Sequence, residues 1–355
     1  MIREVFSKIN ADNAVFRDPC YEWEEECAKY LSIQLTRVVD TSTQPALGGD
    51  TRTLKTLVKQ SLRKILPLPY YLMHRIKWIR NTPPLSQDIN SDLSLCFVMF
   101  VGELSEYIGK NCLPVFIDVW TKDELSDIVR RTKDFKIFYV TSRDIYNRVK
   151  AKAPSSNVRY MPLSIADKYH SQNFAAYRNK YIDVFMPGRG NPVLHKYMLR
   201  YADEHKNIKY VYRHSNWECK STDGSISLKA ADRAGYMNIL ASSRVSLLGC
   251  SGIDNAREGS NGICFVTPRF YESAVMGCAL IGRYPDNQEF TELNMRKYCP
   301  NITSYEQFCE ALEHALAQTP EELYAQNHDF IINSLTSKRA EQILHDLEAL
   351  TCRNS

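Results

Sequence analysis

Long apolar runs, redox-cofactor motifs and a strong net charge are all missing from this sequence of 355 residues. No apolar stretch reaches the roughly 18–20 residues needed to span a bilayer. The N-terminal segment MIREVFSKIN has no apolar core, so we expect no signal peptide and a cytoplasmic protein. No Gly-x-Gly-x-x-Gly motif follows an apolar run, which argues against an NAD(P)-dependent oxidoreductase. A net charge of +4 does not indicate a nucleic-acid partner, and we expect none.

Patterns of metal ligands are missing as well. The 11 cysteines include no Cys-x-x-Cys pair, and none of their spacings fits a zinc site. Several lie within apolar runs, such as Cys96 and Cys278, so we expect buried, reduced thiols. An Asp-x-Asp pair, which could hold Mn²⁺ or Mg²⁺ at a diphosphate, does not occur. The sequence therefore predicts no metal site and no cofactor.

The residues that are present indicate a folded α/β protein of two domains. Hydrophobic residues make up 44% and charged residues 24% of the chain, which is typical of globular proteins. Residues 1–50 predict strand, helix and strand, with Asp18 as the helix cap, Pro19 at its first position and an acidic run from Glu22 that suits the helix dipole. Short apolar runs then alternate with helical segments, as in parallel sheets. The later predicted strands are 93–101, 113–120, 135–142, 158–164, 182–185, 208–213, 245–249 and 278–284, and the predicted helices include 103–110, 122–132, 143–152, 192–205, 228–241, one from Pro268 and 337–351.

Residues 165–180 are polar, carry no strand pattern and form the predicted linker. We expect an N-terminal domain over 1–170, a C-terminal domain over 171–335, and a last helix within 336–355 that packs back on the N-terminal domain. Two parallel α/β units joined in this way face each other across a cleft, and ligands bind at the carboxyl ends of their strands. Loops that follow strands are therefore the candidate sites.

The most informative segment is SNGICFVTPRFYESAVMGCALIGRYPDNQEF, residues 260–290. Thr267 and Pro268 predict a helix start, with Arg269 in the first turn and Glu272 one turn further on. An arginine at a helix N-terminus favours phosphate binding, and a glutamate there can accept hydrogen bonds from two ribose hydroxyls. The plainer alternative is a surface ion pair between Arg269 and Glu272.

This segment resembles the donor-site helix of the group 1 glycosyltransferases of the GT-B fold, closest to the bacterial spore-maturation-like branch. The matching positions are Arg269, Tyr271, Glu272 and Gly277. The resemblance implies two Rossmann-like parallel-sheet domains that face a cleft, with the nucleotide sugar on the C-terminal domain and the acceptor on the N-terminal domain. It implies that Glu272 binds the donor ribose and that the helix start faces the diphosphate. Where the family has a second glutamate, eight residues earlier, this sequence has Cys264.

Further candidate residues follow other predicted strands. Gly188 and Arg189 lie in a glycine-rich turn that could approach the donor phosphates, although the turn could also be an ordinary connection. The loop 249–262 offers Asp254, Asn255 and Arg257 to the sugar, or is simply exposed to solvent.

Carboxylates near the cleft supply the candidate catalytic group. Asp118 lies near the end of a strand in the N-terminal half, where it could act as a base toward an acceptor hydroxyl or be a structural core-edge residue. Asp286 and Glu289, in the turn after 278–284, are candidates to approach the cleft. His74 is a weaker candidate.

The basic segment 51–80 contains eight Lys and Arg residues and no Asp or Glu, interleaved with apolar and aromatic residues. Such a segment can lie on an anionic membrane surface or form a solvated helix face. We therefore expect a cytoplasmic protein whose segment 51–80 could contact the inner face of the plasma membrane.

The resemblance implies a metal-independent glycosyltransferase. It would transfer a hexose from a nucleotide diphosphate sugar, with UDP preferred over GDP, to a saccharide or lipid-linked saccharide in cell-surface polysaccharide synthesis. The alternatives are a sugar-nucleotide epimerase of the same fold and a non-catalytic saccharide-binding member.

Overall fold

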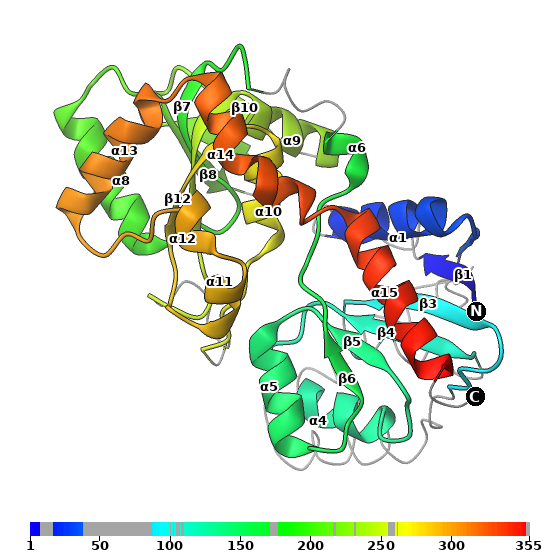
Figure 1. Ribbon diagram of the computed structural model, residues 1–355. Coiled ribbons are helices and arrows are strands. Elements are labelled where there is room, and N and C mark those ends of the chain that lie inside the picture. Colours follow the sequence, from blue (N-terminus) through cyan, green and yellow to red (C-terminus); the bar gives the residue numbers. More distant parts are fainter. Residues whose placement is uncertain are drawn as a thin grey trace, which may run out of the picture.

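The computed structural model describes residues 1–7, 17–37, 87–99, 101, 103, 107, 110–170, 177–215, 218–230, 232–254, 260 and 262–352. These residues form two six-stranded sheets, each flanked by helices, and Figure 1 shows the resulting α/β domains side by side. The predicted architecture of two Rossmann-like units is confirmed. The basic segment 51–80, with His74, lies outside the described residues.

The N-terminal sheet is entirely parallel, in the order β2-β1-β3-β4-β5-β6. Every residue of β3, β4 and β5 is buried, because helices cover both faces of a parallel sheet and leave no solvent side. This explains why these strands read as unbroken apolar runs in the sequence. The strands are β1 (Ile2–Ser7), β2 (Gln34–Arg37), β3 (Leu93–Val98), β4 (Cys112–Phe116), β5 (Phe138–Val140) and β6 (Val158–Tyr160).

The C-terminal sheet has a parallel centre and an antiparallel edge, in the order β10-β9-β8-β7-β11-β12. The sequence predicted a helix over 228–241, but its first two residues lie in strand β10. Helix α9 begins only after Asp232, whose side chain accepts a hydrogen bond from Gly235 N at 2.7 Å. The strands are β7 (Ile182–Met186), β8 (Tyr210–Ser215), β9 (Glu218–Ser221), β10 (Ser227–Lys229), β11 (Ser243–Gly249) and β12 (Ala279–Arg283).

Most helices begin at a side chain that caps their first N–H groups. Thr121 and Glu124 form a capping box at α4, and Asn191 accepts hydrogen bonds from two N–H groups at the start of α8. The predicted cap at Asp18 is wrong: the N-cap of α1 is Arg17, and Asp18 is already helical. The predicted helix 103–110 falls largely outside the described residues. The helices are α1 (Asp18–Leu31), α4 (Lys122–Arg131), α5 (Arg143–Lys152), α6 (Asp167–His170), α8 (Pro192–Glu204), α9 (Arg233–Ala241), α10 (Pro268–Val275), α11 (Gln288–Glu292), α12 (Met295–Tyr298), α13 (Tyr305–Ala317), α14 (Pro320–Ile332) and α15 (Thr336–Thr351).

The chain crosses between the domains twice, and the two crossings pair with each other. Ile165 N donates to Ser334 O at 2.9 Å, and Thr336 N donates to Ile165 O at 3.0 Å. Helix α15 then runs alongside α1 in the N-terminal domain (Figure 1), where Tyr30 Oη donates to Glu341 at 3.0 Å. The last helix therefore completes the domain in which the chain began.

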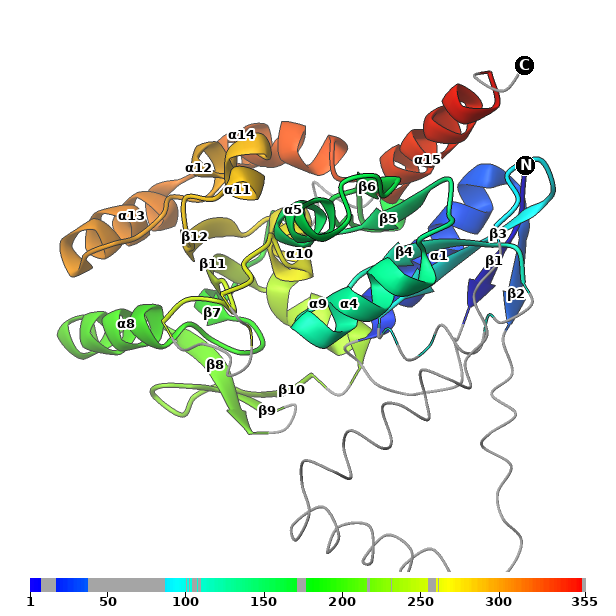
Figure 2. The ribbon, with the colours of Figure 1, turned by 90° about the horizontal axis from the view of Figure 1, so that it is seen from below.

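The core has two parts. One apolar cluster runs from the N-terminal sheet into the helices of the C-terminal domain that face it. Trp120 and Phe265 belong to this cluster and join the two domains, with ring centroids 4.9 Å apart. The other lies on the far side of the C-terminal sheet, where α8 and α13 pack together away from the N-terminal domain (Figure 2). Nine of the 11 cysteines are buried. Among the described helices, none combines the length and apolarity required to cross a bilayer.

Gly277 lies just after the end of α10, and a substitution there tests how α10 packs against the predicted linker. Its φ is +69°, and an added Cβ would lie 2.7 Å from the ring of Tyr177. We expect Gly277→Ala to lower the free energy of unfolding by about 2–5 kcal/mol, because a left-handed conformation and an overpacked contact both cost energy. The matched control is Gly224→Ala, with φ +72° and nothing within 4 Å of the added Cβ, for which we expect a loss of about 1–2 kcal/mol. Equal losses in urea denaturation would contradict the steric account.

Candidate functional site

A cavity of about 570 Å³ lies between the two domains. Its walls come largely from loops at the carboxyl ends of strands: Met99 follows β3, Ile117 follows β4, and Gly188 follows β7. Ligands of α/β sheets bind at such positions, and the volume suits a small-molecule ligand. The cavity is lined by Pro19, Trp23, Met99, Ile117, Asp118, Trp120, Leu163, Phe185, Gly188, Arg189, Arg213, Cys219, Ala230, Arg233, Tyr236, Ser251, Phe265, Thr267, Pro268, Arg269 and Glu272.

The two walls differ in chemistry. The N-terminal wall is mostly apolar and aromatic, with Asp118 as its charged residue among those described. The C-terminal wall carries four of the described arginines and the carboxylate of Glu272. The cavity therefore has a side rich in arginine and an apolar side. The apolar N-terminal residues are Pro19, Trp23, Met99, Ile117, Trp120 and Leu163, and the arginines are Arg189, Arg213, Arg233 and Arg269.

Arg269 braces the glycine-rich turn after β7. Its Nη1 donates to Pro187 O at 3.1 Å and to Arg189 O at 2.7 Å. Gly188 lies between these carbonyls with φ +64°, a conformation that glycine adopts readily, and this shape lets both carbonyls reach one guanidinium. The structure thus brings Gly188, Arg189 and Arg269 together, and Arg269 holds the backbone of the turn while also lining the cavity.

Helix α10 begins at the cavity, and its cap differs from the prediction. Thr267 occupies the N-cap position, but its side chain makes no capping hydrogen bond. Its buried Oγ1 has no hydrogen-bond partner within the described part of the chain. Because Thr267 and Pro268 both line the cavity, this hydroxyl lies beside the positive end of the helix, where an anion is favoured.

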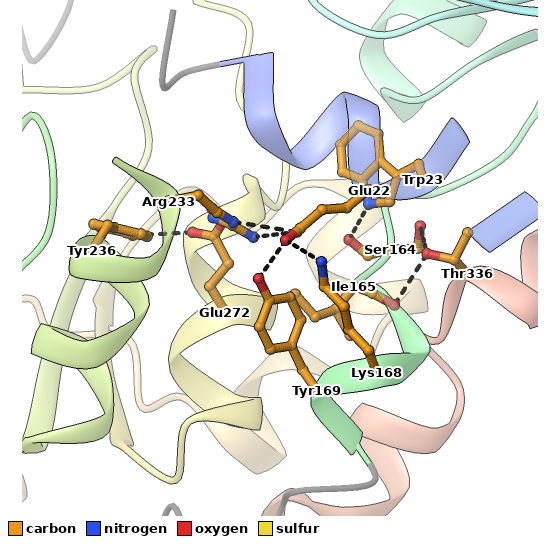
Figure 3. A network of polar contacts seen from close by, with 10 residues as sticks. All are labelled: Glu22, Trp23, Ser164, Ile165, Lys168, Tyr169, Arg233, Tyr236, Glu272 and Thr336. Carbon is orange, nitrogen blue, oxygen red and sulfur yellow. Dashed lines mark hydrogen bonds and ion pairs between the residues drawn. The ribbon is translucent and has the colours of Figure 1, made fainter. Parts of the chain in front are cut away.

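Glu272 is 2% exposed, so it does not form the surface pair with Arg269 that the sequence left open. Arg233 Nη1 donates to its Oε1 at 2.5 Å, and Tyr236 Oη donates to its Oε2 at 3.0 Å. Figure 3 shows the carboxylate held between these two side chains of α9. Glu272, the candidate residue for binding the ribose, is therefore buried at the edge of the cavity, and its carboxylate has a defined orientation.

Arg233 links Glu272 to the other domain. Its Nε and Nη2 donate to Glu22 Oε2 of α1, at 3.2 and 2.9 Å (Figure 3). Glu22 also accepts from Tyr169 Oη and pairs with Lys168 Nζ at 2.9 Å. Burial raises the pKa of the Glu22 carboxyl, but Arg233, Tyr169 and Lys168 outweigh it and hold that pKa below its ordinary value. Burial lowers the pKa of Arg233, and the two carboxylates more than reverse this.

Sequence reasoning missed Arg233, Tyr236 and the role of Glu22. The acidic run that contains Glu22 suits the helix dipole, which suggests an exposed side chain. Glu22 is instead 6% exposed and accepts hydrogen bonds from Arg233, which lies 211 residues further along the chain. The only local signal for Arg233 was Asp232, a good helix cap directly before it. Nothing in the spacing could pair Arg233 with Glu22.

Two predicted donor residues lie outside the cavity lining. Tyr271 is buried against Phe330, with ring centroids 5.2 Å apart. Asp254 has φ 52°, and its carboxylate accepts from Arg283 Nε at 2.6 Å, from Arg283 Nη2 at 3.0 Å and from Asn191 Nδ2 at 2.8 Å. It therefore ties the loop after β11 to β12 and to the start of α8. Asn255 and Arg257 lie outside the described residues.

Asp118 lines the cavity, whereas Cys264 does not. Asp118 accepts a hydrogen bond from the indole of Trp120. Cys264, at the position of the family's second glutamate, is 2% exposed, and its backbone N–H donates to Asp144 Oδ2 at 3.3 Å across the domain boundary. A role of Asp118 as a base stays a prediction. Asp286, by contrast, is exposed and pairs with Arg296.

Glu289 forms a second contact between the domains. Its Oε1 accepts from Val266 N at 2.8 Å, and its Oε2 accepts from Arg143 N, at the start of α5, at 2.7 Å. The neighbouring Glu292 pairs with Arg143 Nη2 at 2.6 Å. Burial raises the pKa of Glu289 to about 8, although the two N–H groups partly oppose this. The segment that leads into α10 is thus joined to the N-terminal domain by a buried carboxyl group.

Among the described residues, no group of three or more His, Cys, Asp and Glu side chains is arranged to hold a metal ion.

Comparisons with known proteins bear on the fold. No family model and no curated protein matches the sequence. The Escherichia coli trehalose-6-phosphate structure bound with UDP-2-fluoro glucose matches at 13% identity and a TM-score of 0.53, over 98% of this chain and 99% of that chain. Together with the two Rossmann-like sheets, this match shows that the chain has the GT-B fold.

Other solved structures are less similar. The pneumococcal O-GlcNAc transferase GtfA, in complex with UDP and GlcNAc, matches at 12% identity and a TM-score of 0.40, over 73% of this chain and 57% of that chain. The UDP-GlcNAc 2-epimerase of Methanocaldococcus jannaschii, in complex with UDP-GlcNAc and UDP, matches at 11% identity and a TM-score of 0.44, over 98% of this chain and 100% of that chain. This chain spans little more than half the length of several larger structures that it matches.

The raised pKa of Glu289 predicts a pH dependence of stability. Unfolded, the carboxyl loses its proton near pH 4.5, and in the folded protein it does so at about pH 8. The folded state binds more protons between these values, so this contribution to the free energy of unfolding is complete below pH 4.5 and is lost as the pH rises through 8. We expect the melting temperature of Glu289→Gln to fall less steeply than that of wild type over this interval.

The control is Glu292→Gln, in the same short helix, which should keep the wild-type slope because it leaves Glu289 in place. Parallel melting-temperature curves for wild type and Glu289→Gln would contradict the assignment.

Proposed function

We propose that the chain is a glycosyltransferase that moves a hexose from a nucleotide diphosphate sugar, with UDP preferred, to a saccharide or lipid-linked saccharide. The observation that carries this proposal is the cavity between the two domains, in which Glu272 and four arginines face an apolar wall. The GT-B fold supports an arrangement in which each domain holds one substrate. The resemblance of the α10 segment to a donor-site helix supports placing the nucleotide on the C-terminal domain.

On the donor side, each side chain has a chemical task in this proposal. The Glu272 carboxylate accepts hydrogen bonds from the two ribose hydroxyls. The diphosphate lies at the start of α10, where backbone N–H groups and Thr267 Oγ1 can donate to it. Arg189 and Arg269 add positive charge beside the same position, and arginine suits phosphate oxygens because of its forked donors.

In the reaction, the acceptor oxygen bonds to the anomeric carbon of the hexose while the bond from that carbon to the diphosphate oxygen breaks. Negative charge develops on the leaving diphosphate, and arginines held in advance by the protein stabilise it without reorganisation. This role of the arginines is the reason for proposing a metal-independent reaction without a cofactor. Asp118 is the candidate that takes the proton from the acceptor hydroxyl.

The acceptor is proposed to bind at the apolar wall of the N-terminal domain. Trp23, Trp120, Ile117 and Leu163 line this wall, and their apolar surface suits the apolar face of a sugar ring. Such a wall suits a saccharide or the first part of a lipid-linked saccharide. We propose a cytoplasmic reaction in cell-surface polysaccharide synthesis, with segment 51–80 as the part that would contact a membrane surface.

The first test is a thermal-shift screen of the protein against UDP, GDP, CMP and NAD. A ligand that binds only the folded state raises its melting temperature. We expect UDP to raise it and Glu272→Gln to weaken UDP binding roughly tenfold to hundredfold, because the hydrogen bonds from the ribose lose a charged acceptor. The KM for the nucleotide sugar should rise with the Kd.

Glu292→Gln serves as the control, because it removes a carboxylate from another contact between the domains and should bind UDP like wild type. Unchanged UDP binding in Glu272→Gln would sink the assignment of the donor site. A shift with NAD alone would overturn the proposed function. Consumption of UDP-sugar without acceptor and without release of UDP would identify an epimerase instead.

A further inference from the structure

The polar network around Glu272 extends across both domains and is nearly closed to solvent. The side chains of Glu272, Glu22 and Arg233 are 3%, 8% and 13% exposed. Two carboxylates from different domains therefore share one guanidinium, and Lys168 adds a second positive charge on the Glu22 side. Burying these charges is costly unless each one is paired. The need to keep every charge paired restricts the side chains to a well-defined geometry.

The hydrogen bonds of Glu272 leave room for a ligand. An ionised carboxylate offers about four lone-pair sites on its two oxygens. Arg233 takes one on Oε1, and Tyr236 takes one on Oε2. One site remains on each oxygen, and Glu272 lines the cavity. Two neighbouring hydroxyl groups can donate to this arrangement, one to each oxygen.

The orientation of Arg233 depends on the N-terminal domain. Two nitrogens of the guanidinium donate to one oxygen of Glu22, Oε2, and the third donates to Glu272. These contacts together fix the plane of the guanidinium. Glu22 in turn is held by Tyr169 and Lys168, in the segment that crosses between the domains. A chain of charged contacts thus runs from α1 to the Glu272 carboxylate (Figure 3).

We propose that Arg233 is a positioning residue for the donor's ribose, and that Glu22 of the opposite domain holds it in place. This inference rests on the proposed function. Nucleotide affinity then depends on the two domains lying together, although the nucleotide contacts the C-terminal domain.

The test compares UDP with 2′,3′-dideoxy-UDP, which lacks both ribose hydroxyls, by calorimetric titration of the full chain. The measured quantity is the Kd for 2′,3′-dideoxy-UDP divided by the Kd for UDP. This ratio isolates the contribution of the two hydroxyls to binding, and comparing it between variants forms a double-mutant cycle. We expect Glu22→Gln to reduce this ratio about tenfold, because it removes the charge that orients Arg233. The Kd for 2′,3′-dideoxy-UDP should be the same in both proteins.

Two further variants keep the test decisive. Tyr169→Phe removes a single hydrogen bond to Glu22 and should reduce the ratio in the same direction by a smaller factor, so it replaces Glu22→Gln if that variant does not fold. Glu292→Gln breaks the Arg143 pair at another contact between the domains and should leave the ratio unchanged.

The outcomes separate this inference from the proposed function. A wild-type ratio that persists in Glu22→Gln and Tyr169→Phe would overturn the positioning role and leave the donor site intact. Equal weakening of both nucleotides in Glu22→Gln would also overturn it, because it would indicate a general opening of the cleft. If wild type binds neither nucleotide, or both equally, the assignment of Glu272 to the ribose fails and this inference fails with it.

Discussion

The rest of the site depends on the two ion pairs of the buried Arg233 guanidinium. This guanidinium is a single positive charge shared by a carboxylate of each domain, with both pairs almost closed to water. In such surroundings no member of the group can be removed or displaced without leaving another charge unpaired, which is far costlier than losing an exposed ion pair. The position of Glu272 at the cavity is therefore a property of both domains together.

Arg269 and Arg283 also bind the protein itself, and of these two only Arg269 lines the cavity. Arg269 holds the carbonyls on both sides of Gly188, and Arg283 holds the carboxylate of Asp254 at the loop after β11. The described residues of these loops belong to no sheet, so guanidinium groups supply donors that a sheet would otherwise provide. The result is a wall rich in arginine opposite a largely apolar wall.

The sequence predicted the architecture well, because buried parallel strands appear as short apolar runs such as LSLCFV in β3. The start of α10 was also correct, since Thr267 and Pro268 are local signals. The edge strands β9 and β10 were missed because they are short, and five of their seven residues are polar or charged. The partners of Glu272 were missed for a different reason: Arg233 and Glu22 are distant in sequence, and local spacing carries no information about such pairs. All of the predicted donor roles remain predictions, namely those of Gly188, Arg189, Asp254, Thr267, Arg269, Tyr271 and Glu272.

The return of α15 to the N-terminal domain has a consequence for the order in which the protein is made. Translation produces α1 and the first sheet early, but the helix that packs against α1 emerges from the ribosome only after the whole second domain has been synthesised. The first domain therefore cannot complete its packing during its own synthesis, unlike a domain whose segments are contiguous in sequence. The face of α1 that packs against α15 stays uncovered until α15 has been synthesised. The crossings that pair at Ile165 and Leu335 can likewise form only after the second domain has been synthesised.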